Sequence, residues 1–246
     1  MDRSAGERGE CERVLEHWAG AVGCPLDGLA LARFDAYARV LLEWNRRFNL
    51  TRITDLQGVY VKHFADSLAL CAVSEVLLGE RLLDVGSGAG FPGLALKIAR
   101  PRLEVTLCDS LAKRVSFLVQ AAAEVGLEAQ CVHGRAEDLA RHGAGYRARF
   151  GVATARAVAP LRVLVEWGMP FVRREGVFVA MKGRGCAEEV GEARRAVALL
   201  GGEVERVVEY DLPLGAGGRA LIVIRKVRET PERFPRRAGE ASRSPL

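Results

Sequence analysis

The chain has 246 residues, of which 49% are hydrophobic and 27% charged, a composition typical of a globular domain of ordinary size with room for a small second one. Its longest apolar runs, residues 68–73 and 176–181, are far shorter than the roughly 20 residues of a membrane span. The six cysteines and four histidines match neither a disulfide framework nor a zinc pattern, so we expect no metal and no disulfide. Residues 1–20 show no secretory or lipidation signal, which predicts a cytoplasmic protein without membrane contact.

Two helices are predicted near the amino terminus, a short one over residues 11–23 and a longer one over residues 28–48. The longer one has apolar residues at spacings of three and four, which places them along one helix face. These residues are Ala30, Phe34, Tyr37, Leu41, Trp44 and Phe48. We interpret this stripe as core that packs on a helical segment over residues 59–73, so residues 1–75 are predicted to form a helical subdomain.

From residue 81 onward, short apolar runs alternate with helical segments. Strands are predicted over residues 81–85, 104–108, 128–132, 149–154 and 176–181, and helices over residues 91–100, 112–125, 136–141, 160–172 and 187–200. Such units imply a parallel sheet covered by helices on both faces. Two further strands, 203–210 and 220–227, must pair antiparallel, because a parallel pair needs a long crossover. Residues 76–227 are therefore predicted to form an α/β, Rossmann-like domain with a seven-stranded, mostly parallel sheet that ends in an antiparallel hairpin, the layout of class I S-adenosylmethionine-dependent methyltransferases.

A glycine-rich loop follows the first predicted strand, between Asp84 and Gly93. Its glycines fit two registers, Gly86-x-Gly88-x-Gly90 and a dinucleotide-type pattern that begins at Gly88. Charge distinguishes the two, because Asp84 at the end of the strand would repel a pyrophosphate and attract a cationic ligand. S-adenosylmethionine carries an ammonium and a sulfonium, and its single carboxylate suits the free N–H groups at the start of the next helix. The loop therefore predicts a site for S-adenosylmethionine.

Acidic residues also follow the next two predicted strands. The second strand leads to Asp109, 25 residues after Asp84, where a carboxylate can accept hydrogen bonds from both hydroxyls of a ribose. The third leads to residues 134–138, Gly-Arg-Ala-Glu-Asp, where an acidic side chain or a backbone group can meet the adenine amino group. Any one of these acids could be a helix N-cap or a surface charge. Three at successive strand ends favour one shared ligand site, because ligands of such sheets bind at the carboxyl ends of the strands.

The sequence lacks the motifs of several methylation reactions, and this narrows the range of possible methyl acceptors. All nine prolines are isolated, unlike the paired prolines common in methylation of the adenine amino group in DNA. Neither Pro-Cys nor Thr-Cys occurs, and Cys108 has no activating base, which argues against cytosine C5 methylation. No pairing of histidine or lysine indicates a general base, so an acceptor with a free lone pair is favoured, such as N7 of guanine. In-line transfer then depends on proximity and orientation, and looped RNA offers an accessible guanine.

The net charge of +5 is concentrated at the carboxyl end. Residues 225–246 hold 7 Lys and Arg against 3 Asp and Glu, a balance of +4, whereas residues 1–80 hold 9 against 12, a balance of −3. We interpret residues 228–246 as a basic tail that contacts a polyanion. The alternative is a solvated, partly disordered terminus, and charge alone does not distinguish the two.

Several short motifs along the chain match one family. They are Trp44-Asn45, Asn49-Leu50-Thr51, residues 63–68 (His-Phe-Ala-Asp-Ser-Leu), residues 84–93, Asp109-Ser110, Lys113-Arg114, residues 135–137, residues 154–157 (Thr-Ala-Arg-Ala), Lys182-Gly183 and residues 234–237 (Phe-Pro-Arg-Arg). On these motifs the chain resembles the ribosomal RNA small subunit methyltransferase G family, also called glucose-inhibited division protein B, over nearly its whole length. The most specific pieces are the Phe-Pro-Gly ending of the glycine loop and the Asp-Ser-Leu piece.

The resemblance implies methylation of N7 of one guanine in the decoding-region loop of 16S ribosomal RNA, with 16S rRNA or the 30S subunit as partner and S-adenosylmethionine as cofactor. Together, the loop and the resemblance predict a cofactor site of Asp84, Gly86, Gly88, Gly90, Phe91, Asp109, Ser110, Ala136, Glu137 and Arg156. Arg156 follows the fourth strand, where the acceptor pocket should open. Contact with the cofactor or the guanine is favoured there over a surface ion pair, so Arg156 is also the candidate catalytic residue.

Basic side chains that could contact RNA are predicted in two places. Lys182 and Arg184 follow the fifth strand among glycines, and Arg236 and Arg237 lie in the tail. The tails of the family usually mix lysine with arginine, whereas this tail is dominated by arginine, which preserves attraction to phosphate but puts the details of the RNA contact in doubt. His63 and Asp66 lie three residues apart on a predicted helix, where a local hydrogen bond is weighed against an RNA or catalytic role.

Two other functions stay open at this point. A small-molecule methyltransferase would use the helical part as a lid and leave the basic tail without a role. A non-catalytic module would bind S-adenosylmethionine only as a structural ligand. We expect the protein to be a monomer.

Overall fold

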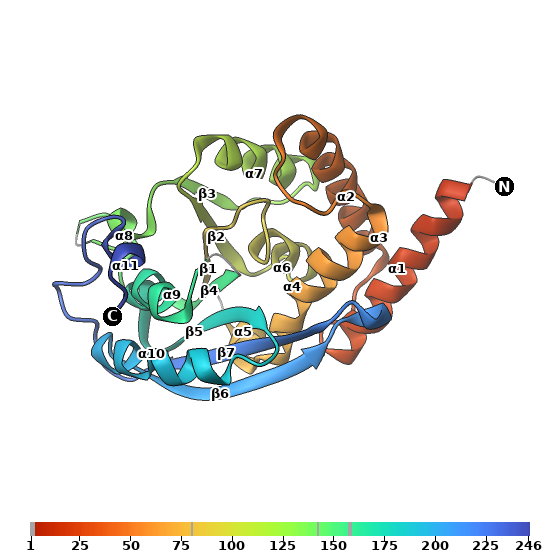
Figure 1. Cartoon of the computed structure of the whole chain (residues 1–246). Helices are drawn as coiled ribbons and strands as arrows, with labels where there is room; N and C mark the ends of the chain where they lie inside the picture. The colour runs from red at the N-terminus through yellow and green to blue at the C-terminus, as the bar shows by residue number, and fades with distance from the viewer. Residues whose placement is uncertain (1–2, 80, 142, 157–158) are drawn as a thin grey trace.

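The computed structural model describes residues 3–79, 81–141, 143–156 and 159–246. Across these residues, a seven-stranded sheet has the order β3-β2-β1-β4-β5-β7-β6 (Figure 1). The strands are β1 (Arg81–Val85), β2 (Glu104–Asp109), β3 (Gln130–His133), β4 (Phe150–Arg156), β5 (Val172–Gly183), β6 (Gly202–Asp211) and β7 (Gly218–Lys226). Neighbours among β1 to β5 are parallel, and β7 is antiparallel to both β5 and β6. The predicted mixed sheet with its antiparallel hairpin is confirmed.

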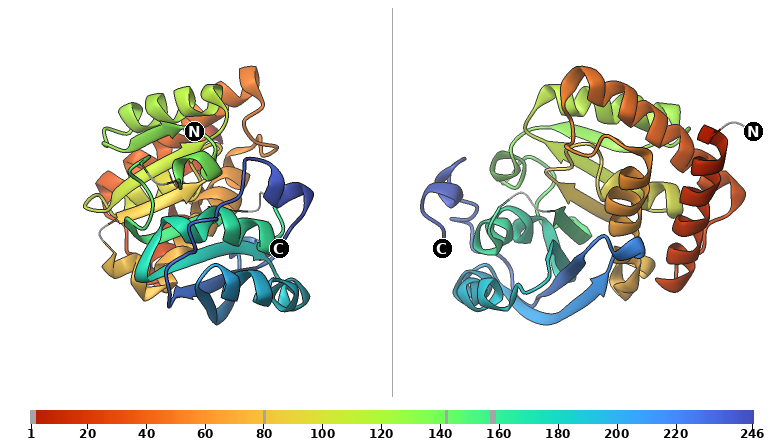
Figure 2. Two further views of the ribbon diagram at one scale, coloured as in Figure 1. Left: turned by 90° about the vertical axis from the view of Figure 1, so that its left-hand side faces the viewer. Right: turned by 45° about the vertical axis from the view of Figure 1, so that its right-hand side comes forward.

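Successive residues of the central strands face opposite sides of the sheet and contribute to two cores. In β1, Leu82 packs into the core on one side and Leu83 into the core on the other. Only Arg81 of this strand is exposed, because helices cover both faces of the sheet (Figure 2). The strand order reverses between β1 and β4, since the chain runs outward from β1 to β3 and then returns to the other side of β1. Ligand sites of such sheets lie beside this reversal.

The helices divide between the two faces. Those that pack on the Leu82 side are α1 (Arg3–Ala21), α2 (Gly28–Phe48), α6 (Gly93–Ala99) and α7 (Ala112–Glu124), with the short segments α3 (Leu56–Gly58), η1 (Val59–Ala65), α4 (Asp66–Leu68), η2 (Ala69–Ala72) and α5 (Ser74–Leu78). Those on the Leu83 side are α8 (Ala136–Leu139), α9 (Leu161–Gly168), η3 (Met169–Phe171) and α10 (Ala187–Leu199). The turn η4 (Pro213–Gly215) joins β6 to β7, and α11 (Glu240–Arg243) lies in the tail. No helix among the described residues is long and apolar enough to span a membrane.

The predicted helical part, residues 1–75, shares one core with the sheet. Phe34 and Tyr37 of α2 belong to the same buried cluster as Leu107 of β2, so the division of the chain at residue 75 stays a prediction. The first helix begins at Arg3 instead of residue 11, because the residues before Cys11 carry no apolar repeat that would reveal it. The helix after the glycine loop begins at Gly93 instead of residue 91.

The basic tail is folded against the Leu83 side. Phe234 and Ala241 are buried, and Arg147 donates hydrogen bonds of 2.7 Å to the carbonyls of Thr230 and Phe234. These contacts order the chain up to α11, which packs beside α9 (Figure 1). A solvated, disordered terminus therefore does not describe this segment.

Candidate active site

The loop after β1 reaches the end of β2 through its glycines. Gly86, Gly88 and Gly90 have φ of 72°, 58° and 90°, a region that glycine adopts without a steric penalty. The N–H of Gly86 donates to the carbonyl of Cys108 at 2.9 Å, and the N–H of Gly88 donates to Oδ2 of Asp109 at 2.9 Å. These bonds hold the loop at the carboxyl ends of β1 and β2, where the ligand was predicted.

Asp84 lies beneath this loop and supports it. Its side chain is fully buried, and Oδ2 accepts a hydrogen bond of 2.9 Å from the N–H of Gly93. Oδ1 has no hydrogen-bond partner in the described part of the chain, and burial raises the pKa of this carboxyl to about 7. A buried carboxylate oxygen without a partner is costly. It therefore fits a site in which a ligand brings a donor or a positive charge.

A cavity of about 190 Å³ lies at the ends of β1, β2 and β3. Its lining consists of Val85, Gly86, Cys108, Asp109, Ser110, Arg114, Gly134, Arg135, Ala136, Glu137 and Trp167. Of the residues predicted for the cofactor, the fold brings Gly86, Asp109, Ser110, Ala136 and Glu137 together here. The others, Asp84, Gly88, Gly90, Phe91 and Arg156, lie outside this lining.

Asp109 and Glu137 are the two carboxylates of the cavity, and both are almost fully buried. Asp109 accepts the bond from Gly88, and the guanidinium of Arg114 lies 3.3 Å from its Oδ2. Glu137 accepts a hydrogen bond of 2.9 Å from the N–H of Gly239 in the tail, through Oε1. Both carboxylates are thus fixed by neighbours, and they can accept bonds from hydroxyl or amino groups of a ligand.

Two further side chains line the cavity although the sequence reasoning assigned them no role there. Arg114 lies in the first turn of α7, five residues after Asp109, and this short spacing is a signal that could have revealed it. Trp167 lies near the end of α9, and its buried Nε1 has no partner among the described residues. No local pattern points to Trp167, because α9 reaches the cavity only through tertiary packing.

Arg156, at the end of β4, is the centre of a polar cluster beside the glycine loop. Its NH1 group donates to Oδ2 of Asp66 at 3.2 Å, and its NH2 group donates to Nδ1 of His63 at 3.0 Å. The guanidinium lies 5.1 Å from the centre of the Phe91 ring, which stacks on His63 with ring centres 4.4 Å apart. The next residue of the motif, Ala157, lies outside the described residues. The sequence leaves open whether His63 and Asp66 form a local hydrogen bond or have a role in RNA binding or catalysis. In the structure, both side chains bind Arg156.

His63 lies in η1, a π-helix, which is a rare geometry that is frequent at functional sites. Burial, together with the charge of Arg156, lowers the pKa of His63 to about 3, so the ring is neutral near pH 7. Because Arg156 donates to Nδ1, the hydrogen-bond pattern assigns the ring proton to Nε2, which donates to Oγ1 of Thr51 at 2.8 Å. Both ring nitrogens are occupied, which makes His63 a support for Arg156 and Phe91 and leaves it no lone pair for a general base.

The four predicted RNA-contacting cations lie in different surroundings. Lys182 pairs with Glu189 at 2.7 Å, and Arg184 pairs with Asp211 at 2.9 Å. Arg236 forms a forked ion pair with the buried carboxylate of Glu166, from Nε at 2.9 Å and from NH2 at 2.6 Å. Arg237 is exposed. The structure therefore leaves Arg237 open to solvent, whereas the other three side chains also serve internal ion pairs.

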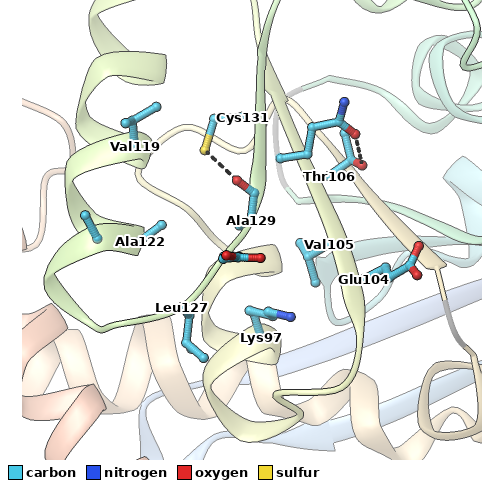
Figure 3. A pocket seen from close by; sticks show the side chains of 12 residues that line it. Lys97, Glu104, Val105, Thr106, Val119, Ala122, Leu127, Ala129 and Cys131 are labelled. Carbon is cyan, nitrogen blue, oxygen red and sulfur yellow. Dashed lines mark hydrogen bonds between the residues drawn. The ribbon is translucent and has the colours of Figure 1, made fainter.

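Several larger cavities lie outside this site, and two of them have similar volumes. One, of about 750 Å³, follows the turn between α2 and α3 and is lined in part by Arg46, Arg52 and Arg114. Arg114 also lines the smaller cavity, so the two adjoin. The other, of about 720 Å³, lies at the opposite ends of β2 and β3 (Figure 3). There the amine of Lys97 donates to the carbonyls of Pro101 and Leu103, and this is the wrong end of the strands for a ligand site of this fold.

Comparison with known proteins gives a consistent result. A family model described as rRNA small subunit methyltransferase G matches residues 30–214. The ribosomal RNA small subunit methyltransferase G of Alkaliphilus oremlandii is 42% identical over 239 residues, covering 96% of this chain and 99% of that protein. The protein of the same name from Geobacillus kaustophilus is 46% identical over 225 residues, covering 91% and 94%. An O-methyltransferase structure from Bacillus cereus in complex with SAH has a TM-score of 0.54 at 15% identity, over 85% of this chain and 96% of that chain, which shows likeness of fold.

Proposed function

The chain belongs to the rRNA small subunit methyltransferase G family, and on this premise we propose that it transfers the methyl group of S-adenosylmethionine to N7 of a guanine in 16S ribosomal RNA. The observation that carries the proposal is the cavity at the ends of β1, β2 and β3, whose lining includes the buried carboxylates of Asp109 and Glu137. This cavity supports a cofactor site at the ends of these strands.

Residues of this cavity have complementary roles toward S-adenosylmethionine. Asp109 would accept hydrogen bonds from the ribose hydroxyls, and Glu137 with the backbone near Ala136 would meet the adenine end. The free Oδ1 of Asp84 and the backbone of the glycine loop would lie toward the charged amino acid end. When bound, the cofactor supplies a methyl group on a positively charged sulfur, which is susceptible to in-line displacement by a lone pair.

The acceptor nitrogen needs no proton removed, because N7 of guanine carries a free lone pair. This agrees with the site, in which His63 is neutral and both of its nitrogens are hydrogen-bonded. Catalysis then comes from holding the two reactants in line, an effect that can account for a large part of a rate enhancement. We propose that Arg156, kept in place by Asp66 and His63, positions the guanine or the reacting end of the cofactor.

The cavity of about 750 Å³ that is lined by Arg46, Arg52 and Arg114 forms a groove that adjoins the cofactor cavity. The RNA would reach the site along this groove. Its guanidinium groups can bind phosphates or stack on unpaired bases. Arg237 in the tail would add attraction for phosphate, and so would Lys182, Arg184 and Arg236. We further propose that the enzyme is cytoplasmic and that it is a monomer. Sedimentation of the purified chain tests the monomeric state.

Incubation with S-adenosylmethionine labelled in its methyl group tests the proposal. The acceptors are 30S subunits, naked 16S rRNA and free nucleosides, each with the natural chain and with Asp109→Ala. Label in the ribosomal RNA, strongly reduced by Asp109→Ala, is the expected result. Label on free nucleosides alone would indicate a small-molecule methyltransferase, and cofactor binding without label on any acceptor would indicate a non-catalytic module.

A further inference from the structure

We propose that the carboxyl-terminal tail is part of the cofactor site, because residues 234–241 hold the carboxylate of Glu137 in the orientation in which it meets the ligand. This inference rests on the proposed function, since it names the elements that position one residue of the proposed cofactor cavity. It gives the ordered tail a role in addition to its positive charge.

The contact that carries the inference joins residues 102 positions apart. The N–H of Gly239 donates to Oε1 of Glu137 at 2.9 Å, and Glu137 is only 3% exposed at the wall of the cavity. Gly239 has a φ of 82°, a conformation that residues with side chains rarely adopt, and it stands directly before α11. The bond from Gly239 occupies Oε1 and leaves Oε2 for a ligand. Without the tail, the carboxylate would lose this donor and turn toward solvent.

A buried anchor fixes the segment that leads to Gly239. Glu166 on α9 is fully buried and accepts bonds from Nε and NH2 of Arg236 and from the backbone N–H of Arg236. Three bonds on one carboxylate define the path of the tail over α9. The next residue of α9, Trp167, lines the cofactor cavity. The anchor and the cavity are therefore built on the same helix, so the position of Gly239 relative to Glu137 is well determined.

This arrangement connects the proposed RNA surface to the cofactor site. Arg237 is exposed and stands between the anchor at Arg236 and the contact at Gly239. If RNA binds at Arg237, it stabilises the tail in the position that holds Glu137. Any such coupling is reciprocal, because two ligands that share a conformational element raise each other's affinity by the same factor.

A pair of truncated chains tests the inference through binding of S-adenosylhomocysteine, measured by isothermal titration calorimetry. The chain ending at Arg237 keeps the anchor to Glu166 but lacks Gly239. We expect it to bind about ten-fold more weakly, the effect of losing one hydrogen bond to a charged group. The chain ending at Arg243 keeps Gly239 and α11 and should bind like the full chain. Equal affinity of all three chains would overturn the inference.

The Glu137→Ala substitution in the full and the shortened chain shows whether the tail acts through Glu137. We expect Glu137→Ala to weaken binding in the full chain and to add little in the chain ending at Arg237. Independent, multiplying effects of the two changes would contradict this role of the tail. If the full chain does not bind S-adenosylhomocysteine, the proposed function itself is contradicted. Thermal unfolding of each chain verifies that it is folded.

Discussion

The NH2 group of Arg156 donates a 3.0 Å hydrogen bond to Nδ1 of His63, a residue 93 positions earlier in the chain. The bond connects the end of β4 to the π-helix η1, and Phe91 of the glycine loop stacks on the same histidine. It therefore ties the helical part of the chain to the sheet beside the proposed site of methyl transfer. The charge of Arg156 helps to keep His63 neutral, and the neutral ring in turn offers Arg156 an acceptor.

Replacement of Arg156 by lysine should lower kcat for methylation of 16S rRNA by about 10- to 100-fold, since misplacement by about 1 Å can have an effect of this size. A lysine keeps the charge but cannot bind Asp66 and His63 from one planar group. The affinity for S-adenosylhomocysteine should stay within two-fold, because Arg156 lies outside the lining of the cofactor cavity. Arg149→Lys, at an exposed position just before the opposite end of β4, is the control for replacing an arginine by lysine away from the site. A large loss of cofactor affinity in Arg156→Lys would place this residue in the cofactor site instead.

Asp109→Ala should weaken binding of S-adenosylhomocysteine by at least about ten-fold, because it removes a buried carboxylate that we propose accepts bonds from the ribose. It also removes the acceptor of the Gly88 N–H, which fixes the glycine loop. The control is Asp138→Asn, an exposed carboxylate near the same strand ends that pairs only loosely with Arg141, at 3.9 Å. Calorimetry gives both affinities, and an Asp109→Ala chain that binds normally would remove Asp109 from the proposed site.

The stability of the protein should depend on His63 below pH 6.5. In the unfolded chain this histidine takes up a proton near pH 6.5, whereas in the folded chain its pKa is lowered to about 3. The unfolded state thus binds more protons between these values, and the free energy of unfolding falls as the pH decreases from 6.5 toward 3. The slope approaches about 1.4 kcal/mol for each pH unit.

Urea denaturation at pH 7.5 and 5.5 tests this dependence on the natural chain and on His63→Gln. The natural chain should lose about 1.4 kcal/mol more than the variant between the two values. The same loss in both chains would show that His63 is protonated normally in the folded state.

Neutralising Arg46 and Arg52 together should weaken binding of 16S rRNA fragments and make it less sensitive to salt. Each phosphate contact to a single strand contributes about 0.7 to the slope of log K against log salt concentration, so the slope should decrease by about 1.4. The control is Arg39→Gln. Arg39 lies on α2 like Arg46, but it is exposed outside the groove, so its replacement should leave the slope unchanged. Fluorescence anisotropy over a range of salt concentrations measures both, and an unchanged slope in the double variant would exclude the groove as the RNA path.

The strands and the glycine loop could be predicted from the sequence because their signals are local. Apolar runs marked β1 and β5, and Asp84 and Asp109 lie at the carboxyl ends of β1 and β2. The surroundings of Glu137 could not be predicted, because its donor Gly239 comes from a tail whose composition suggested only charge. The same holds for the pairing of Arg156 with His63, since hydrogen bonds between distant segments leave no periodic pattern in a sequence.

The central claim, methylation at N7 of guanine in 16S rRNA, is tested most directly by chemical mapping of the modified base. N7-methylguanine in RNA becomes a site of strand cleavage after borohydride reduction and aniline treatment. We predict that 16S rRNA incubated with the enzyme and S-adenosylmethionine is cleaved at one new guanine, and that the cleavage disappears with Asp109→Ala. Methyl label in the RNA without this cleavage, or the absence of label from 16S rRNA in every form, would contradict the account.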